Sequence, residues 1–145
     1  MTVDANLPRD YVSRDDVRME AYRRLAAVTR DADVDDIRDE WLDRYGPLPP
    51  PAEALLEVAR LRAECVRLGI RSVTVARGMA RLQPVELRES QKVRLKRLAP
   101  KAVAKADGEL AVPVPPKETP AGFLVGLLRD LLPEPAAAPV ASAAP

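Results

Sequence analysis

The chain has 145 residues, of which 47% are hydrophobic, and this is enough to form the core of one domain. Histidine is absent and Cys65 is the only cysteine, which excludes Cys/His zinc sites, Ser–His and Cys–His catalysis, and an intrachain disulfide. The net charge of +1 conceals an acidic half before residue 70 and a basic half after it, which either face each other or meet separate partners.

No stretch of the sequence is suited to cross a membrane. The apolar runs are shorter than the ~20 residues that span a bilayer, and the start of the chain lacks the basic and apolar regions of a signal peptide. We therefore expect a cytoplasmic protein that has no membrane partner.

Helical periodicity and capping residues predict three helices in the first half of the chain. Glycine and proline mark their ends, because glycine caps the C-terminus of a helix and proline is tolerated in its first turn. The first helix is predicted over residues 14–29, the second from Asp33 to Gly46, and the third from Pro50 to Gly69.

Apolar positions in these helices identify the expected core. Trp41 lies on the apolar stripe of the second helix and is predicted to anchor it. The third helix carries a wide apolar arc that includes Val58, Cys65 and Val66, which is typical of a central helix. Cys65 is therefore expected to be a packed thiol rather than a reactive one.

The hydrophobic pattern changes to the period of strands after residue 70. Residues 72–76 and 79–83 alternate on either side of Arg77-Gly78, which predicts a hairpin. Residues 88–98 fit a short basic helix or a strand, and we favour the helix. The remaining predicted elements are a strand at Val103, a strand over 110–114 and an amphipathic helix over 123–132.

This order of elements predicts an α+β fold. We expect three N-terminal helices packed on a small, mainly antiparallel sheet, with a short helix and a C-terminal helix. The expected organisation is an extended N-terminal segment over 1–12, a single α+β domain over 13–132, and a disordered Pro/Ala tail over 133–145.

One face of the predicted second helix is unusually acidic. It carries Asp36, Asp39, Glu40 and Asp43, which lie opposite the apolar stripe at 3.6 residues per turn and which we call the acidic ridge. Like charges at this spacing repel by roughly 0.2–0.5 kcal/mol per pair, and the helix dipole disfavours Asp43 in the last turn. The ridge is either a solvated face or a surface that docks on a basic partner.

The sequence predicts no catalytic or cofactor site. Its glycines match neither the phosphate-binding loop nor the dinucleotide-binding pattern, which excludes the usual nucleotide enzymes. A hydrolase or a divalent-metal site on the ridge is disfavoured, because a catalytic carboxylate needs a cleft and a perturbed pKa rather than a convex helix face.

A second candidate surface is the basic segment over residues 88–105. Clustered cations bind nucleic acid by releasing counterions from phosphates, so this segment is the alternative functional surface. Aromatic residues make up only 3% of the chain, which leaves few side chains to stack on bases. The cations of the segment are Lys92, Arg94, Lys96, Arg97, Lys101 and Lys105.

Four stretches of the chain occur in an order that resembles a known family. They are residues 4–12, 18–25, 39–49 and 55–70, and the most specific pattern in them is Glu-x-x-Asp-Arg-Tyr-Gly-x-x-Pro, which starts at Glu40. Together they resemble the C-terminal domain of the bacterial transcription-repair coupling factor. Residues 71–132 match in outline only, and the tail does not match.

The family consists of long ATP-driven DNA translocases that displace stalled RNA polymerase and recruit nucleotide excision repair. The resemblance implies that this chain is a fragment of such a parent, namely a non-catalytic regulatory domain over 13–132. By this resemblance it masks the module that binds excision-repair protein A until the translocase engages RNA polymerase and DNA. ATP and Mg would be bound by other domains of the parent, and the fragment is expected to be a monomer without a cofactor.

The resemblance also adds weight to the acidic ridge. Glu40 and Asp43 match the acids of the family's signature helix, so they are the main predicted partner-binding residues. Asp36 and Asp39 adjoin them on the same helix face and complete the predicted site. Two residues depart from the family pattern: Tyr45 stands for the usual phenylalanine, and Ala99 stands where an aromatic residue often precedes proline.

Overall fold

The computed structural model describes residues 5–133, and these fold into five helices and a four-stranded sheet. The α+β prediction is confirmed. In chain order the elements are α1 (Asp15–Ala26), α2 (Asp31–Tyr45), α3 (Pro50–Leu68), β1 (Ser72–Ala76), β2 (Met79–Gln83), α4 (Glu89–Leu98), β3 (Val103–Ala104), β4 (Leu110–Pro113) and α5 (Pro120–Leu131). The predicted tail lies outside the described residues except for Pro133.

The helix boundaries differ from the predictions at three places, and one of them is α5, which begins at Pro120 rather than at residue 123, because Thr119 caps it and proline is tolerated in a first turn. The first helix ends at Ala26, because Val28 N donates to Leu25 O at 3.2 Å in a tighter turn that brings the Val28 side chain into the core. The second helix starts at Asp31, so that Asp33 lies in its first turn, where its N–H donates to Arg30 O. The favoured helix over 88–98 is confirmed as α4.

The sheet is antiparallel throughout and has the order β1-β2-β4-β3. The predicted hairpin is confirmed, with Ala76 paired to Met79 across Arg77 and Gly78. Both turn residues have positive φ, 55° and 74°, which fits the tight turns that join twisted antiparallel strands. β1 and β3 therefore form the two edges of the sheet.

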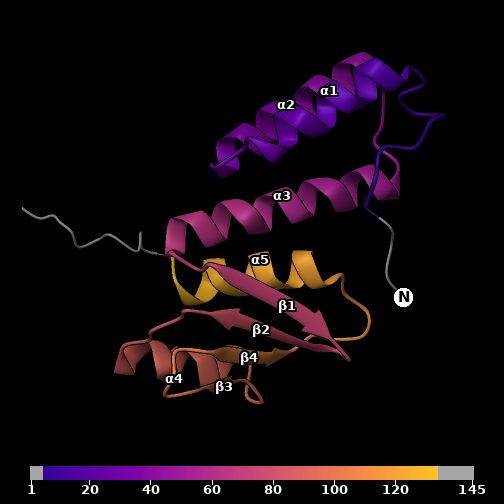
Figure 1. Ribbon diagram of the computed structural model, residues 1–145. Helices are drawn as coiled ribbons and strands as arrows, with labels where there is room; N and C mark the ends of the chain where they lie inside the picture. Colours follow the sequence, from indigo (N-terminus) through magenta and orange to yellow (C-terminus); the bar gives the residue numbers. More distant parts are fainter. Residues whose placement is uncertain (1–4, 134–145) are drawn as a thin grey trace, which may run out of the picture.

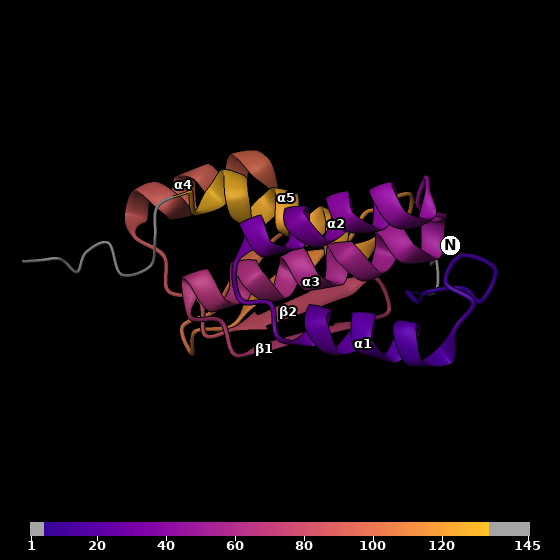
Figure 2. The same ribbon diagram turned by 90° about the horizontal axis from the view of Figure 1, so that it is seen from above.

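In Figure 1, α1 and α2 form an upper layer and α3 and α5 lie between them and the sheet, whereas α4 lies lower, at the level of β4 and β3. α3 and α5 lie side by side near the sheet, whereas α1 and α2 lie on the far side of α3 (Figures 1 and 2). The three N-terminal helices thus pack on one another, and α3 provides their main contact with the rest of the domain.

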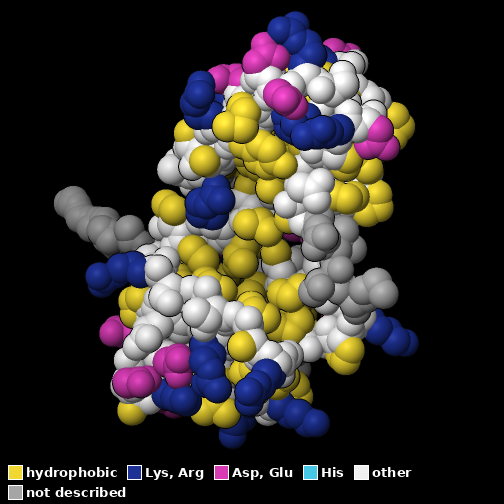
Figure 3. Space-filling view, turned by 45° about the vertical axis from the view of Figure 1, so that its right-hand side comes forward, with side chains coloured by type: hydrophobic (Ala, Val, Ile, Leu, Met, Phe, Trp, Pro, Cys, Tyr) yellow, Lys and Arg dark blue, Asp and Glu magenta, His cyan; other side chains and the backbone are white. Residues whose placement is uncertain are grey.

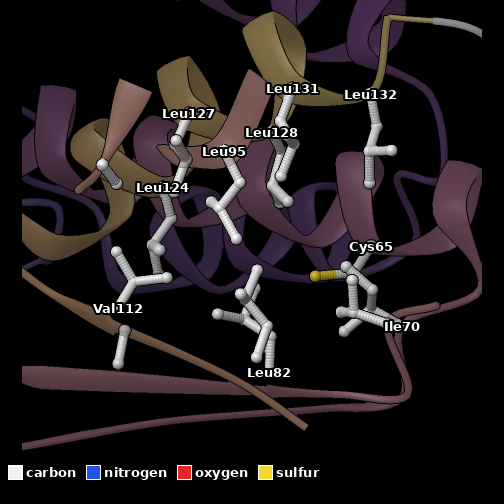
Figure 4. Close-up of a cluster of buried hydrophobic side chains, with 14 residues drawn as sticks. Cys65, Ile70, Leu82, Leu95, Val112, Leu124, Leu127, Leu128, Leu131 and Leu132 are labelled. Atoms are coloured by element: carbon white, nitrogen blue, oxygen red, sulfur yellow. The ribbon is translucent and has the colours of Figure 1, made fainter. Parts of the chain in front are cut away.

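Two hydrophobic clusters reflect this arrangement. The upper cluster joins α1, α2, the first half of α3 and the segment before α1, with Trp41 only 2% exposed. The lower cluster joins the sheet to α4, α5 and the end of α3, and Figure 4 shows Leu82, Leu95 and Leu128 pointing toward one another within it. Trp41 and Cys65 are buried as predicted.

The segment before α1 is attached to the upper cluster. Pro8 O accepts hydrogen bonds from Tyr11 N and Val12 N, both at 3.0 Å, so the segment contains a turn. The Tyr22 hydroxyl accepts a hydrogen bond from Leu7 N at 2.8 Å, and Leu7 and Val12 are both buried. These residues therefore belong to the core rather than to a free extension.

The start of α5 is tied to α3 by a small polar contact. Thr119 caps α5 by accepting from Gly122 N at 3.3 Å, and its hydroxyl donates to Glu57 Oε1 at 2.8 Å. A Cβ atom on Gly122 would lie 2.7 Å from Thr119 Oγ1 and 2.9 Å from Glu57 Oε2, which is too close for either atom to stay in place.

We therefore expect Gly122→Ala to lower the free energy of unfolding by about 1–2 kcal/mol, since the lost cap outweighs alanine's higher helix propensity. Gly126→Ala in the same helix is the matched control, because no atom lies within 4 Å of its added Cβ. The control should be neutral or stabilising by up to about 1 kcal/mol. Urea denaturation measures both variants, and equal values for the two would contradict this account.

Candidate functional site

The acidic ridge lies where the sequence placed it, on the face of α2 away from the core. Val34, Ile37 and Trp41 are at most 3% exposed and fix the orientation of the helix. With these residues buried, the ridge carboxylates are turned outward. Figure 3 shows acidic and basic side chains together at the top of the molecule, where α1 and α2 lie.

Glu40 differs from the other ridge residues because it is already paired within the domain. Its Oε1 accepts a hydrogen bond from Arg24 Nη1 of α1 at 2.7 Å, and its Oε2 accepts one from Arg44 Nη1 at 3.3 Å. The hydrogen bond from Arg24 is the main cause that holds the pKa of Glu40 below its usual value. Glu40 is therefore charged at neutral pH and links α1 to α2.

The other three ridge carboxylates are exposed. Within residues 5–133, neither Asp36 nor Asp43 forms an ion pair or a side-chain hydrogen bond. The pKa of Arg38 is raised, mainly because Arg38 donates a hydrogen bond to Glu53, and the negative charge of the adjacent Asp39 adds to this shift. These three carboxylates are therefore exposed to cations of a binding partner.

Two further acids of α2 have an internal role. Asp31 and Asp35 form ion pairs with Arg60 of α3, at 3.1 and 2.6 Å. Asp31 also forms an ion pair with Arg129 of α5 at 2.6 Å. Arg129 in turn approaches the buried Glu64 at 3.5 Å. This network joins α2, α3 and α5, so α2 uses one set of acids inside the domain and presents another to solvent.

Sequence reasoning missed one residue beside the ridge. Leu42 follows the buried Trp41 but is itself 43% exposed, and its neighbour along the chain is Asp43. An exposed leucine next to carboxylates resembles the apolar centre of a polar interface. Its exposure could have been predicted from the sequence, because Leu42 lies outside the apolar stripe of the helix.

The basic segment over 88–105 is partly used within the domain. Arg94 donates to Leu131 O at 2.7 Å, Lys92 pairs with Glu89 at 3.3 Å, and Lys105 pairs with Glu109 at 3.0 Å. Lys96, Arg97 and Lys101 remain exposed. The structure thus divides the six predicted cations into two groups rather than bringing them together as one surface.

A metal centre, a membrane span and a reactive thiol are three other kinds of candidate feature. In residues 5–133, no group of three or more His, Cys, Asp or Glu side chains is arranged to hold a metal ion. No helix in this range is long and apolar enough to span a bilayer. Cys65 is buried, and this burial raises the pKa of its thiol.

Comparison with known proteins gives consistent matches. A family model described as the TRCF domain matches residues 1–99. The transcription-repair-coupling factors of Mycobacterium bovis and Mycobacterium tuberculosis are each 48% identical over 117 residues, which is 79% of this chain and 10% of the relative. That of Escherichia coli is 39% identical over 67 residues, which is 46% of this chain and 6% of the relative.

The chain therefore spans about a tenth of the length of the two mycobacterial relatives. A solved structure described as the C-terminal domain of transcription-repair coupling factor has a TM-score of 0.72 to this chain. The match covers 92% of this chain and 89% of the other at 22% identity, and at that identity it establishes the fold.

Proposed function

Because the chain belongs to the TRCF domain family, as the C-terminal domain of a transcription-repair coupling factor, we propose that it acts as a non-catalytic regulatory domain. In this proposal the parent is an ATP-dependent DNA translocase that displaces stalled RNA polymerase and recruits nucleotide excision repair. ATP and Mg are bound by its other domains. This domain covers the module that binds excision-repair protein A and leaves it when the translocase engages polymerase and DNA.

The observation that carries the proposal is the set of exposed ridge carboxylates on α2. Asp36 and Asp43 have no ion-pair partner within residues 5–133. The stability of the helix does not explain these acids either, since like charges at this spacing repel. A cover that must be released needs a moderate, polar interface, because charge pairs set orientation and salt sensitivity without giving very high affinity. Arginines on the masked module are the complementary chemistry.

The ion pairs of Glu40 assign it a different part in this interface. Its carboxylate is already shared between Arg24 and Arg44, so a partner arginine would have to compete with both. We infer that Asp36, Asp39 and Asp43 make the direct contacts, with Leu42 at their side. Glu40 holds α1 against α2 and keeps the ridge in position.

We expect the combined change Asp36→Asn, Asp39→Asn and Asp43→Asn to weaken binding of this chain to the isolated module by about tenfold, since each exposed ion pair contributes up to about 1 kcal/mol. The wild-type affinity should fall as salt rises, and the variant should lose most of that dependence. Calorimetry at two salt concentrations measures both effects. In the intact parent, the same change should increase the affinity for excision-repair protein A.

Asp130→Asn is the control for charge alone, because Asp130 is an exposed acid on α5, away from the ridge. It should change neither affinity. The proposal fails if the triple variant binds the module with unchanged affinity and salt dependence. The alternative, nucleic-acid binding through residues 88–105, has less support, because Lys92, Arg94 and Lys105 already have partners in the domain.

A further inference from the structure

An apolar groove lies on a different part of the molecule from the acidic ridge. It has a volume of about 550 Å³ and lies between α3, β1 and the start of α5. Val58 and Val66 of α3 and Val75 of β1 line it, and they are 40%, 56% and 43% exposed. Figure 3 shows hydrophobic side chains gathered across the middle of this face, where the surface is hollowed. Such a grouping of exposed valines is typical of a binding surface.

The floor of the groove is an edge strand. In the described part of the chain β1 pairs with β2 alone, so its other side has no partner strand. In an antiparallel pair, every second residue of a strand uses its backbone N–H and C=O groups to bond the partner strand. The N–H and C=O groups of the residues between them point to the other side, which in β1 is the free edge. The side chains of Val73 and Val75 share one face of β1 and both line the groove. An added strand would therefore place alternate side chains beneath α3.

The charges around this edge are positive. Arg71 precedes β1 and Arg77 follows it, and neither forms an ion pair with a residue in the range 5–133. Arg62 also lines the groove, where its Nη1 donates to Leu25 O at 3.2 Å. The acid at the groove, Glu57, is held by the hydroxyl of Thr119. The groove thus offers an apolar centre with unpaired cations at both ends of its strand.

These cations argue against a second copy of the chain as the occupant. Two β1 strands that paired antiparallel about Thr74 would place Val73 opposite Val75, which is favourable. The same register would place Arg71 opposite Arg77 at each end, with no acid between them. Like charges directly opposite each other destabilise a strand pair, and charged edges commonly prevent such self-association.

We propose that the groove binds an extended acidic–apolar peptide segment, which adds to the free edge of β1 as a new strand. Aliphatic side chains at alternate positions of the segment fill the groove against Val58, Val66 and Val75. Carboxylates at its two ends meet Arg71 and Arg77. The backbone hydrogen bonds provide affinity, and the pockets and charges provide specificity. This surface shares no residue with the acidic ridge, so it is independent of the masking function.

A synthetic peptide tests the proposal directly. The probe is acetyl-Glu-Thr-Val-Thr-Val-Thr-Glu-amide with a fluorescent label, which is as long as the stretch from Arg71 to Arg77 and repeats its alternation. Fluorescence anisotropy with the whole chain should give saturable binding that weakens as salt rises. The same peptide with lysine in place of both glutamates should bind about tenfold more weakly or not at all, because it loses two ion pairs and gains repulsion.

Two valines provide matched protein variants. Val66 lies in the groove and is 56% exposed, and Val93 lies on α4 outside the groove and is 66% exposed, so both tolerate a polar side chain. Val66→Glu should weaken peptide binding by at least about tenfold, since it places a carboxylate against the apolar segment. Val93→Glu should leave binding unchanged. Arg71→Glu combined with Arg77→Glu should reverse the preference toward the lysine peptide.

Three results would overturn the proposal. The first is equal binding of the glutamate and lysine peptides, or binding of neither. The second is full binding by Val66→Glu. The third is a dimer in sedimentation experiments that Val66→Glu abolishes, because this would make a second copy the occupant. Ridge variants such as Asp43→Asn should bind the peptide normally, so failure here is distinct from failure of the masking proposal.

Discussion

Replacement of Trp41 by alanine is expected to lower the free energy of unfolding by about 3–5 kcal/mol. Trp41 is 2% exposed and is the largest side chain in the upper hydrophobic cluster. The Tyr11 hydroxyl donates to Gly46 O at 2.8 Å and lies 3.3 Å from Trp41 O, so the segment before α1 also depends on this part of α2. Loss of the indole would leave a cavity that these elements surround.

Circular dichroism during urea denaturation measures this change, since the variant lacks the chain's only tryptophan. Leu42→Ala is the matched control, because Leu42 is the next residue of the same helix and is 43% exposed. It should cost less than about 1 kcal/mol. A small effect at Trp41 would mean that the upper cluster contributes little to stability.

Replacement of Leu128 by alanine is expected to cost about 2–5 kcal/mol. Leu128 is fully buried in the lower cluster, between the sheet and the helices that cover it (Figure 4). Leu98→Ala is the control, because Leu98 is 40% exposed at the end of α4. Urea denaturation followed by circular dichroism gives the two free energies of unfolding.

The Leu128 variant also tests whether the two clusters unfold together. Trp41 fluorescence reports on the upper cluster, whereas Leu128 belongs to the lower one. α3 contributes to both clusters, and Arg60 and Arg129 tie α3 and α5 to Asp31 of α2. We therefore expect the fluorescence midpoint to fall with the circular dichroism midpoint. A fluorescence transition that stays at the wild-type midpoint would divide the chain into two independent units.

Local signals in the sequence predicted most of the elements. Gly46 and Gly69 end their helices as expected, and both have positive φ, which glycine adopts without strain. The hairpin was predictable from the alternation of apolar and polar residues on either side of Arg77-Gly78. The end of α1 was not, because the turn at Val28 is stabilised by burial of that side chain in contacts with distant parts of the chain.

The acidic ridge was also predictable in position but not in detail. Helical periodicity placed its acids opposite Trp41, and the structure agrees. The sequence could not indicate that Glu40 is paired with Arg24, since that contact depends on how α1 packs against α2. In our proposal, the direct contacts with the masked module are therefore made by Asp36, Asp39 and Asp43 rather than by Glu40.

The sequence by itself determined the helices, the hairpin, the α+β class and the family, because caps, turns and hydrophobic period are properties of neighbouring residues. The tertiary structure decided which apolar and charged groups remain available. The wide arc of α3 predicted that Val58 and Val66 would be buried, and this was wrong, since both are exposed in the groove beside β1. Periodicity gives the direction of a side chain from its own helix, but only the packing of distant elements determines what covers it.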